Sequence, residues 1–155
     1  MTRKLISKFS LAIAPVLIAG ALLTSSASSQ ESERKPCSNR TIAGDYGSAS
    51  VGVLLGIPGL PPEAEFRGLT MTHFDGKGNL SWVEHTVING TPVQAGWIAA
   101  SGTYIVDTNC TGTAVVNTPN SPVPLVLAFV VVRRGKEIHT VLDSDAIASV
   151  FIRVQ

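Results

Sequence analysis

Charged residues are scarce in this sequence. Lysine, arginine, aspartate and glutamate make up 15% of the 155 residues, whereas hydrophobic residues make up 45%. A disordered chain has the opposite balance, with many charges and too few apolar side chains to form a core. The composition therefore indicates a globular protein, and the chain has the length of a single domain.

The N-terminal segment has the layout of a secretory signal peptide. Three basic residues precede an apolar run at 11–23, and small residues at 25–27 provide a cleavage site. The apolar run is shorter than the roughly 20 residues that a membrane-spanning helix needs, so a retained anchor is the less favoured alternative. We expect a signal peptide at residues 1–27 and a secreted or periplasmic mature protein with no membrane span.

The charge balance of the mature chain excludes one large class of partners. Three of the twelve basic residues and none of the eleven acidic residues lie within the predicted signal peptide, so nine basic and eleven acidic residues remain, a net charge of −2. A protein that binds nucleic acid neutralises phosphates with a basic surface. We therefore expect no nucleic-acid partner.

Cysteine is also scarce, and the two cysteines point to a disulfide. An exported chain with one cysteine near its mature start and one in its middle is expected to join them, here Cys37 with Cys110. The alternatives are two free thiols or a metal site, but the Cys-x-x-Cys spacing and a nearby histidine are missing. We expect no metal and no cofactor. The bridge would tie a flexible arm, predicted at residues 28–36, to a single domain at residues 37–155.

Helical periodicity is missing as well. Short segments of strand-forming residues follow one another, and glycine, asparagine and proline turn signals separate them. The predicted fold class is all-β, an antiparallel up-and-down meander that closes into a barrel of eight or nine strands, because closure removes exposed strand edges. The expected strands are residues 43–54, 66–74, 80–88, 94–100, 102–106, 110–117, 125–133, 137–142 and 149–154.

One of the predicted loops is unusually apolar. Residues 56–62 contain three prolines and cannot join a strand ladder. Leu55, Ile57 and Leu60 lie in or beside this loop. We expect it to fold over the mouth of the barrel as a lid, and the alternatives are a structural plug or an exposed contact with a partner or membrane. A second proline-rich loop is expected at residues 118–124.

The hairpin at residues 66–88 permits a prediction of register. Its Asp-Gly-Lys-Gly-Asn turn places Phe74 opposite Leu80, and strand alternation then puts one set of side chains on a common face. We expect this aromatic face to point into the barrel and to form a ligand-binding wall together with the apolar loop. The residues of the aromatic face are Phe66, Thr70, Thr72, Phe74, Trp82 and Glu84.

Glu84 is the one carboxylate on the aromatic face. Burial among apolar side chains disfavours the charged form of a carboxylate, which suits a general acid or a polar anchor for a ligand. The alternative is that Glu84 reaches solvent at the barrel rim. The sequence contains none of the common hydrolase, metalloprotease or nucleotide-binding motifs. Glu84 is the candidate for a catalytic residue, and the alternative is one of the three histidines.

The two ends of the mature chain carry a family resemblance. Gly44-Asp45-Tyr46 opens the first long strand, and Arg153 lies near the end of the last. This arrangement resembles the calycin and lipocalin pattern, in which a glycine and an aromatic residue begin the first strand and an arginine from the final strand packs across the ring. The chain has Tyr46 where lipocalins have tryptophan, and it lacks their long C-terminal helix. A more distant similarity is to allene oxide cyclase and dirigent-type barrels.

The predicted barrel and the resemblance lead to one preferred function and two alternatives. Lipocalin-like barrels have room for one small ligand, so we expect a secreted module that binds a small apolar ligand in or at the mouth of the barrel. The first alternative is a structural or interaction protein of the cell envelope with a packed barrel. The second is a cyclase- or isomerase-like enzyme, as the similarity to allene oxide cyclase implies, in which Glu84 or a histidine performs acid-base chemistry.

Overall fold

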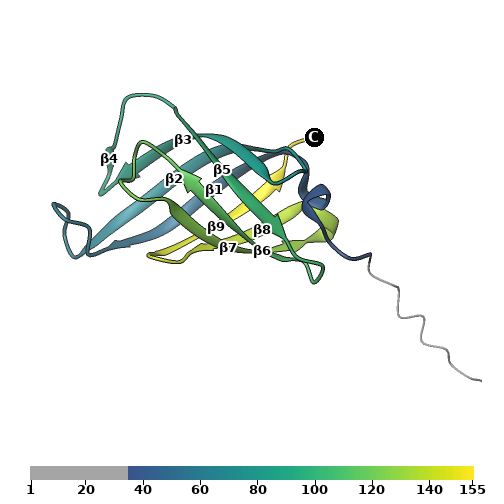
Figure 1. The fold of residues 1–155 in the computed structure, drawn as a ribbon. Helices are drawn as coiled ribbons and strands as arrows, with labels where there is room; N and C mark the ends of the chain where they lie inside the picture. Colours follow the sequence, from purple (N-terminus) through teal and green to yellow (C-terminus); the bar gives the residue numbers. More distant parts are fainter. Residues whose placement is uncertain (1–34) are drawn as a thin grey trace, which may run out of the picture. The chain divides into compact units, whose positions relative to one another are not determined.

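The structure, a computed structural model, describes residues 35–155, and the predicted signal peptide and most of the predicted arm lie outside the described residues. No helix in this part of the chain is long and apolar enough to cross a membrane. Apart from two short 3₁₀ helices, the regular elements are strands (Figure 1). In chain order they are η1 (Asn39–Ile42), β1 (Gly44–Leu55), β2 (Glu63–Phe74), β3 (Asn79–Ile88), β4 (Thr91–Pro92), β5 (Ile98–Val106), β6 (Thr111–Asn117), β7 (Leu125–Val132), η2 (Arg133–Gly135), β8 (Glu137–Leu142) and β9 (Ala146–Arg153).

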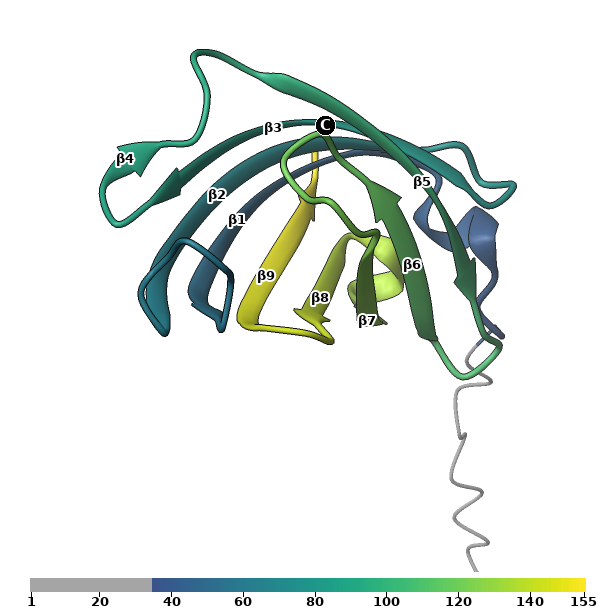
Figure 2. The same cartoon turned by 60° about the vertical axis from the view of Figure 1, so that its left-hand side comes forward.

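Eight of the strands form a closed barrel. Successive strands pair in antiparallel fashion, with β3 pairing to β5, and β9 pairs with β1 to complete the ring. The remaining strand, β4, adds two residues alongside β3 (Figure 2). The predicted fold class, an all-β antiparallel up-and-down barrel, is therefore confirmed.

Two of the predicted strands are a single strand in the structure. The sequence indicated separate strands at 94–100 and 102–106, whereas β5 runs without interruption through Gly102. Gly102 is needed for close packing, because a Cβ atom on it would lie 2.1 Å from the carbonyl oxygen of Val115 on β6. The prediction was wrong here because this glycine serves the contact between two strands and does not mark a turn.

The β2–β3 hairpin has the predicted register. Phe74 pairs with Leu80, and Thr70 pairs with Glu84. The side chains of the predicted aromatic face are buried or half-buried, whereas residues between them, such as Met71, are exposed. The aromatic face therefore points into the barrel.

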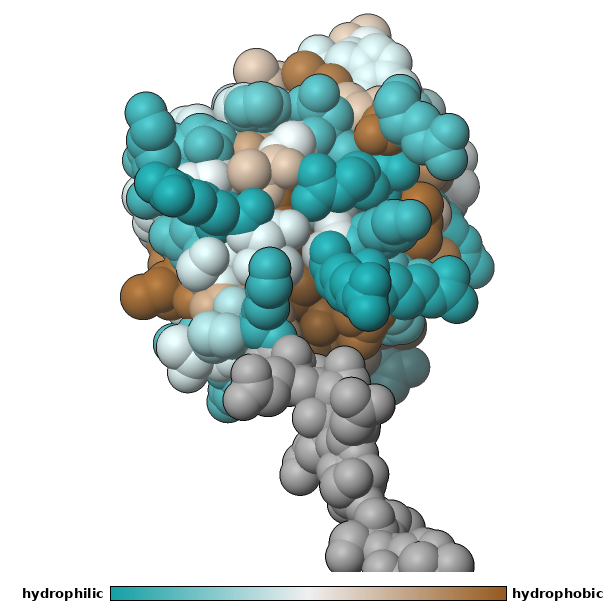
Figure 3. All heavy atoms as spheres, turned by 90° about the vertical axis from the view of Figure 1, so that its right-hand side faces the viewer, coloured by the Kyte–Doolittle hydropathy of each residue, from teal (hydrophilic) through white to brown (hydrophobic). Residues whose placement is uncertain are grey.

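One end of the barrel is filled by side chains. Here η1 lies across the opening, and Ile42 from η1 is completely buried. In the same core cluster as Ile42, the ring of Phe74 packs edge-on against Tyr46 and Tyr104, with centroid distances of 5.5 and 5.0 Å. Hydrophilic residues predominate on the outer surface at this end, with smaller apolar areas between them (Figure 3). We call this the closed end.

The predicted disulfide holds η1 at the closed end. The sulfur atoms of Cys37 and Cys110 lie at bonding distance, and their Cα atoms are 5.0 Å apart. Beside the bridge, the Cys37 amide donates a hydrogen bond of 3.1 Å to the carbonyl oxygen of Thr108. The side-chain oxygen of Asn39 accepts a bond of 2.8 Å from the Val106 amide. The chain before β1 is thus joined to β5 and to the turn that follows it.

Arg153 packs against Tyr46 as the calycin resemblance implied. Its guanidinium lies 4.9 Å from the centre of the Tyr46 ring and donates hydrogen bonds to the Tyr46 hydroxyl at 2.6 Å and to the Gly135 carbonyl oxygen at 3.1 Å. Gly44 makes room for this group: its φ is +127°, and a Cβ there would lie 2.8 Å from the guanidinium. Both the eight-stranded barrel and this packing are compatible with a calycin-like barrel.

Candidate functional site

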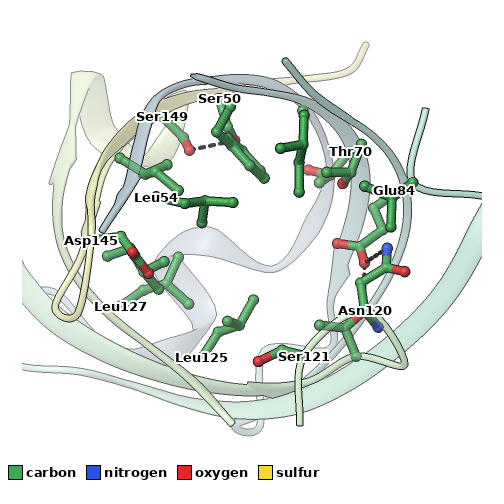
Figure 4. A pocket seen from close by; sticks show the side chains of 18 of the residues that line it. Ser50, Leu54, Thr70, Glu84, Asn120, Ser121, Leu125, Leu127, Asp145 and Ser149 are labelled. Carbon is green, nitrogen blue, oxygen red and sulfur yellow. Dashed lines mark hydrogen bonds between the residues drawn. The ribbon is translucent and has the colours of Figure 1, made fainter. Parts of the chain in front are cut away.

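The end of the barrel opposite the closed end holds a cavity of about 270 Å³ (Figure 4). Four connections meet there: the loops at 56–62 and 118–124, the segment that contains β4, and the turn between β8 and β9. Six strands form the wall, and each contributes at least one apolar side chain, among them Leu54, Phe66, Trp82, Leu127, Leu142 and Ile147. The cavity is therefore largely apolar and lies within the mouth half of the barrel.

Small side chains create this space. Ser50, Gly68 and Ser149 line the cavity on β1, β2 and β9, where larger side chains would fill the interior. The hydroxyls of Ser50 and Ser149 form a hydrogen bond of 2.6 Å with each other. This bond gives each of the two hydroxyls one partner within the wall.

Glu84 is the centre of a polar cluster on the other side of the cavity. Only 6% of its surface is exposed, so Glu84 does not extend into solvent at the rim. Its Oε1 accepts hydrogen bonds from the Thr118 hydroxyl and, at 2.9 Å, from the Asn120 amide nitrogen. Gln94 in turn donates to the Asn120 side-chain oxygen at 2.7 Å, which fixes the orientation of that amide. Both donors suit an ionised carboxylate, which only accepts hydrogen bonds.

The second oxygen of Glu84 has no hydrogen-bond partner among the described residues. All bonds to this carboxylate involve Oε1, and Oε2 is not among the fully enclosed polar atoms without a partner. Figure 4 shows the carboxylate of Glu84 directed into the cavity. This oxygen is therefore open to a hydrogen-bond donor on a ligand.

The charges that line the cavity are all negative. Glu84 and Asp145 contribute carboxylates from opposite sides, and no lysine or arginine of the described chain lines the space (Figure 4). Both oxygens of Asp145 accept hydrogen bonds, Oδ1 from the Leu55 amide at 2.9 Å and Oδ2 from the Ser144 hydroxyl at 3.0 Å. In residues 35–155 no group of three or more acidic, histidine or cysteine side chains is placed to hold a metal ion.

Six of the nine predicted ligand-binding residues line the cavity. Phe66, Thr70, Trp82 and Glu84 do so from the β2–β3 hairpin, and two more, Ile57 and Leu60, do so from the apolar loop.

The other three predicted residues lie outside the cavity. Thr72 and Phe74 are deeper, where Thr72 is fully buried and both border a separate void of about 20 Å³. Leu55 points away from the interior and is 47% exposed, because it follows the inward-facing Leu54 by one position on β1.

The floor of the cavity contains two unpartnered polar atoms. The indole nitrogen of Trp82 and the hydroxyl of Thr140 are buried, and neither has a hydrogen-bond partner among the described residues. Both residues border the cavity and the small void beneath it. They separate the part of the barrel that is open to a ligand from the part that is packed.

Sequence reasoning missed the residues that surround Glu84. Thr118 and Asn120 come from the loop at 118–124, for which the proline content predicted only a connection. Their polar side chains beside prolines carried no signal of a shared site. They meet Glu84 because β3 pairs with β5 and β5 pairs with β6, which brings the β6–β7 loop close to β3.

No protein-family model and no curated protein matches this chain. The calycin resemblance accordingly depends on the closed barrel of eight strands and on the packing of Arg153 against Tyr46. The cavity and its polar cluster are the features of the described chain that bear on function.

Proposed function

We propose that this protein is a secreted or periplasmic module that binds a small apolar ligand inside the barrel. The observation that carries the proposal is the cavity of about 270 Å³ with apolar side chains from six strands. Ligand sites in proteins usually measure about 300–1,000 Å³, so this cavity suits a ligand at the small end of that range. A lipocalin-like barrel of eight strands has room for one such molecule.

The disulfide supports the proposed compartment. Bridges such as Cys37–Cys110 form and persist in oxidising environments outside the cytoplasm. A disulfide therefore fits the secretory signal that the sequence predicts at residues 1–27.

The apolar loop at residues 56–62 supports a route into the cavity. Ile57 and Leu60 face the space, and Ile57 is also 39% exposed, so it borders both ligand and solvent. A hydrogen bond of 3.1 Å from the Leu60 amide to the Ile57 carbonyl oxygen shapes the loop. We propose that this loop acts as the lid of the binding site.

The proposal is tested by calorimetric titration with 1-naphthalenemethanol, a small neutral apolar alcohol. Thr86 lines the cavity and makes no side-chain hydrogen bond among the described residues, so Thr86→Phe fills the space without removing a bond. We expect Thr86→Phe to weaken binding by about tenfold or more. The matched control is Thr113→Phe on the outer face of β6, which should bind like the wild type. Equal binding by Thr86→Phe would place the ligand outside the cavity and contradict the proposal.

A cyclase- or isomerase-like enzyme is the second candidate function. The observation that favours it is the free oxygen of Glu84 inside the cavity, where a general acid or base would contact a substrate. In this case Glu84→Gln would abolish turnover of a bound substrate while leaving its binding intact. The third possibility, an envelope protein with a fully packed barrel, has less support because the interior is hollow at the mouth.

A further inference from the structure

We infer that the ligand of this cavity is a small apolar molecule with a protonated amine, and that the ammonium group binds the free oxygen of Glu84. This inference rests on the proposed ligand-binding function and names the chemical class of the ligand. It depends on three observations: the burial of Glu84, the open position on its carboxylate, and the sign of the charges around the cavity.

The first observation is a buried carboxylate with no cationic partner. Glu84 is 6% exposed, and no ion pair of the described chain includes it. Burying a carboxylate without a counter-charge is costly, and hydrogen bonds compensate only in part. A cation that entered the cavity would supply the missing counter-charge. The apo barrel is thus less favourable for Glu84 than a barrel that holds an ammonium group.

The second observation is the geometry of the Glu84 hydrogen bonds. Thr118 and Asn120 both donate to Oε1, and together they hold the carboxylate in one orientation. The other oxygen then remains available on the cavity side (Figure 4). An ammonium group carries three donors and no acceptor, and it can bond this oxygen without displacing either protein donor.

The third observation concerns the rest of the wall. Asp145 adds a second negative charge across the cavity, and the lining contains no basic side chain of the described residues that could hold a carboxylate or phosphate on a ligand. An anionic ligand such as a fatty acid would meet like charges on both sides. Phe66, Trp82 and Leu127 provide apolar contacts for the rest of the molecule. The arrangement favours cations over neutral molecules and neutral molecules over anions.

Three ligands with the same apolar part test this order. They are 1-naphthylmethylamine, which is a cation at neutral pH, 1-naphthalenemethanol, which is neutral, and 1-naphthoate, which is an anion. In calorimetric titrations of the mature chain we expect the amine to bind about tenfold more tightly than the alcohol. We expect the naphthoate to bind more weakly than either.

Glu84→Gln tests the role of the carboxylate. It keeps the shape of the side chain and an acceptor oxygen for Thr118 and Asn120 while it removes the charge. We expect a loss of about tenfold in affinity for the amine and a change of less than about threefold for the alcohol. The control is Glu63→Gln at an exposed position outside the cavity, which should bind all three ligands like the wild type.

The outcomes separate this inference from the proposed function. If the alcohol binds and the amine binds no more tightly, the amine inference fails and the proposed binding function stands. If none of the three ligands binds, both fail. If Glu84→Gln does not fold, the order of the three ligands on the wild-type protein decides, and tight binding of the naphthoate would overturn the inference.

Discussion

At the scale of single residues, the barrel contains two kinds of buried polar group. The Tyr46 hydroxyl at the closed end donates to the Gly135 carbonyl oxygen and accepts from Arg153, so its hydrogen-bonding capacity is used within the protein. Glu84 at the cavity keeps one oxygen without a partner among the described residues. Buried polar groups are normally satisfied, so this contrast is consistent with a structural role for Tyr46 and supports the proposal that Glu84 contacts a ligand.

The two tyrosines predict a loss of stability at alkaline pH. Burial raises the pKa of Tyr46, against the opposing effect of Arg153, and burial also raises the pKa of Tyr104. The unfolded chain therefore releases these protons first, so the stabilising effect is complete below the ordinary value of 10.0 and is lost as the pH rises through the folded-state pKa. We expect the melting temperature to fall as the pH rises above 10.0.

Tyrosinate absorbance provides the measurement. Tyr46 and Tyr104 are the only two tyrosines of the chain, so the signal reports on the closed end alone. We expect this absorbance to appear together with loss of the folded state. Full ionisation near the ordinary pKa in a protein that stays folded would contradict the prediction.

At the scale of elements, two of the turns differ in the hydrogen bonds that their aspartate side chains make. In the β2–β3 turn, Oδ1 of Asp75 accepts hydrogen bonds from the backbone amides of Lys77, Gly78 and Asn79 at 2.7 to 2.9 Å. These three hydrogen bonds stabilise the turn that sets the register of the β2–β3 hairpin. In the β5–β6 turn, the Asp107 side chain makes no hydrogen bond to the described chain, so the two turns form a matched pair for experiment.

Replacement of Asp75 should destabilise the protein in a pH-dependent manner. The hydrogen bonds from Asn79 and the other turn residues lower the pKa of Asp75 well below its ordinary value of 3.8. Because this pKa is lowered in the folded state, the ionised carboxylate of Asp75 stabilises the fold above pH 3.8. The contribution is lost as the pH falls from 3.8 through the lowered pKa. We expect Asp75→Ala to melt at a lower temperature than the wild type at neutral pH. The difference should shrink in acid, and Asp107→Ala should show no such trend in the same melting series.

At the scale of the whole barrel, stability and the proposed binding function reside at opposite ends. The closed end contains the aromatic cluster, the disulfide and Arg153, whereas the mouth contains the cavity and the Glu84 cluster. Small side chains and an unpaired carboxylate at the mouth leave a cavity, whereas larger apolar side chains there would pack the interior and stabilise the fold. Changes at one end are therefore expected to affect one property and leave the other nearly unchanged.

Removal of the disulfide tests this separation. The bridge spans 73 residues, and a loop of this size stabilises a fold by about 4 kcal/mol in the chain-entropy model. We expect the double change Cys37→Ser and Cys110→Ser to lower the free energy of unfolding in urea by up to about this amount. Affinity for 1-naphthalenemethanol under folded conditions should stay at the wild-type level. A parallel loss of affinity would show that the two ends are coupled.

Local patterns in the sequence were sufficient for several features of the protein. Alternation along residues 66–88 and the glycine-rich turn placed Glu84 on the inner face in the observed register. The two cysteines had one possible intramolecular pairing, and Gly44, Tyr46 and Arg153 carried the signature of their packing. These features depend on neighbours in the chain or on residue types with few alternatives, and such information is present in a single sequence.

The tertiary structure alone decided the composition of the site. Thr118 and Asn120 lie 34 and 36 residues from Glu84 in sequence, and the pairing of β3 with β5 and of β5 with β6 brings them to the same carboxylate. Closure also put Asp145 across the cavity, and the pairing of β5 with β6 made Gly102 a close contact between strands. Strand periodicity specifies which face a side chain takes, whereas the identity of its partners on other strands depends on how the whole sheet curves and closes. The sequence thus determined an all-β barrel with a Cys37–Cys110 bridge and an inward-facing Glu84, and the fold determined that one oxygen of this carboxylate has no partner among the described residues.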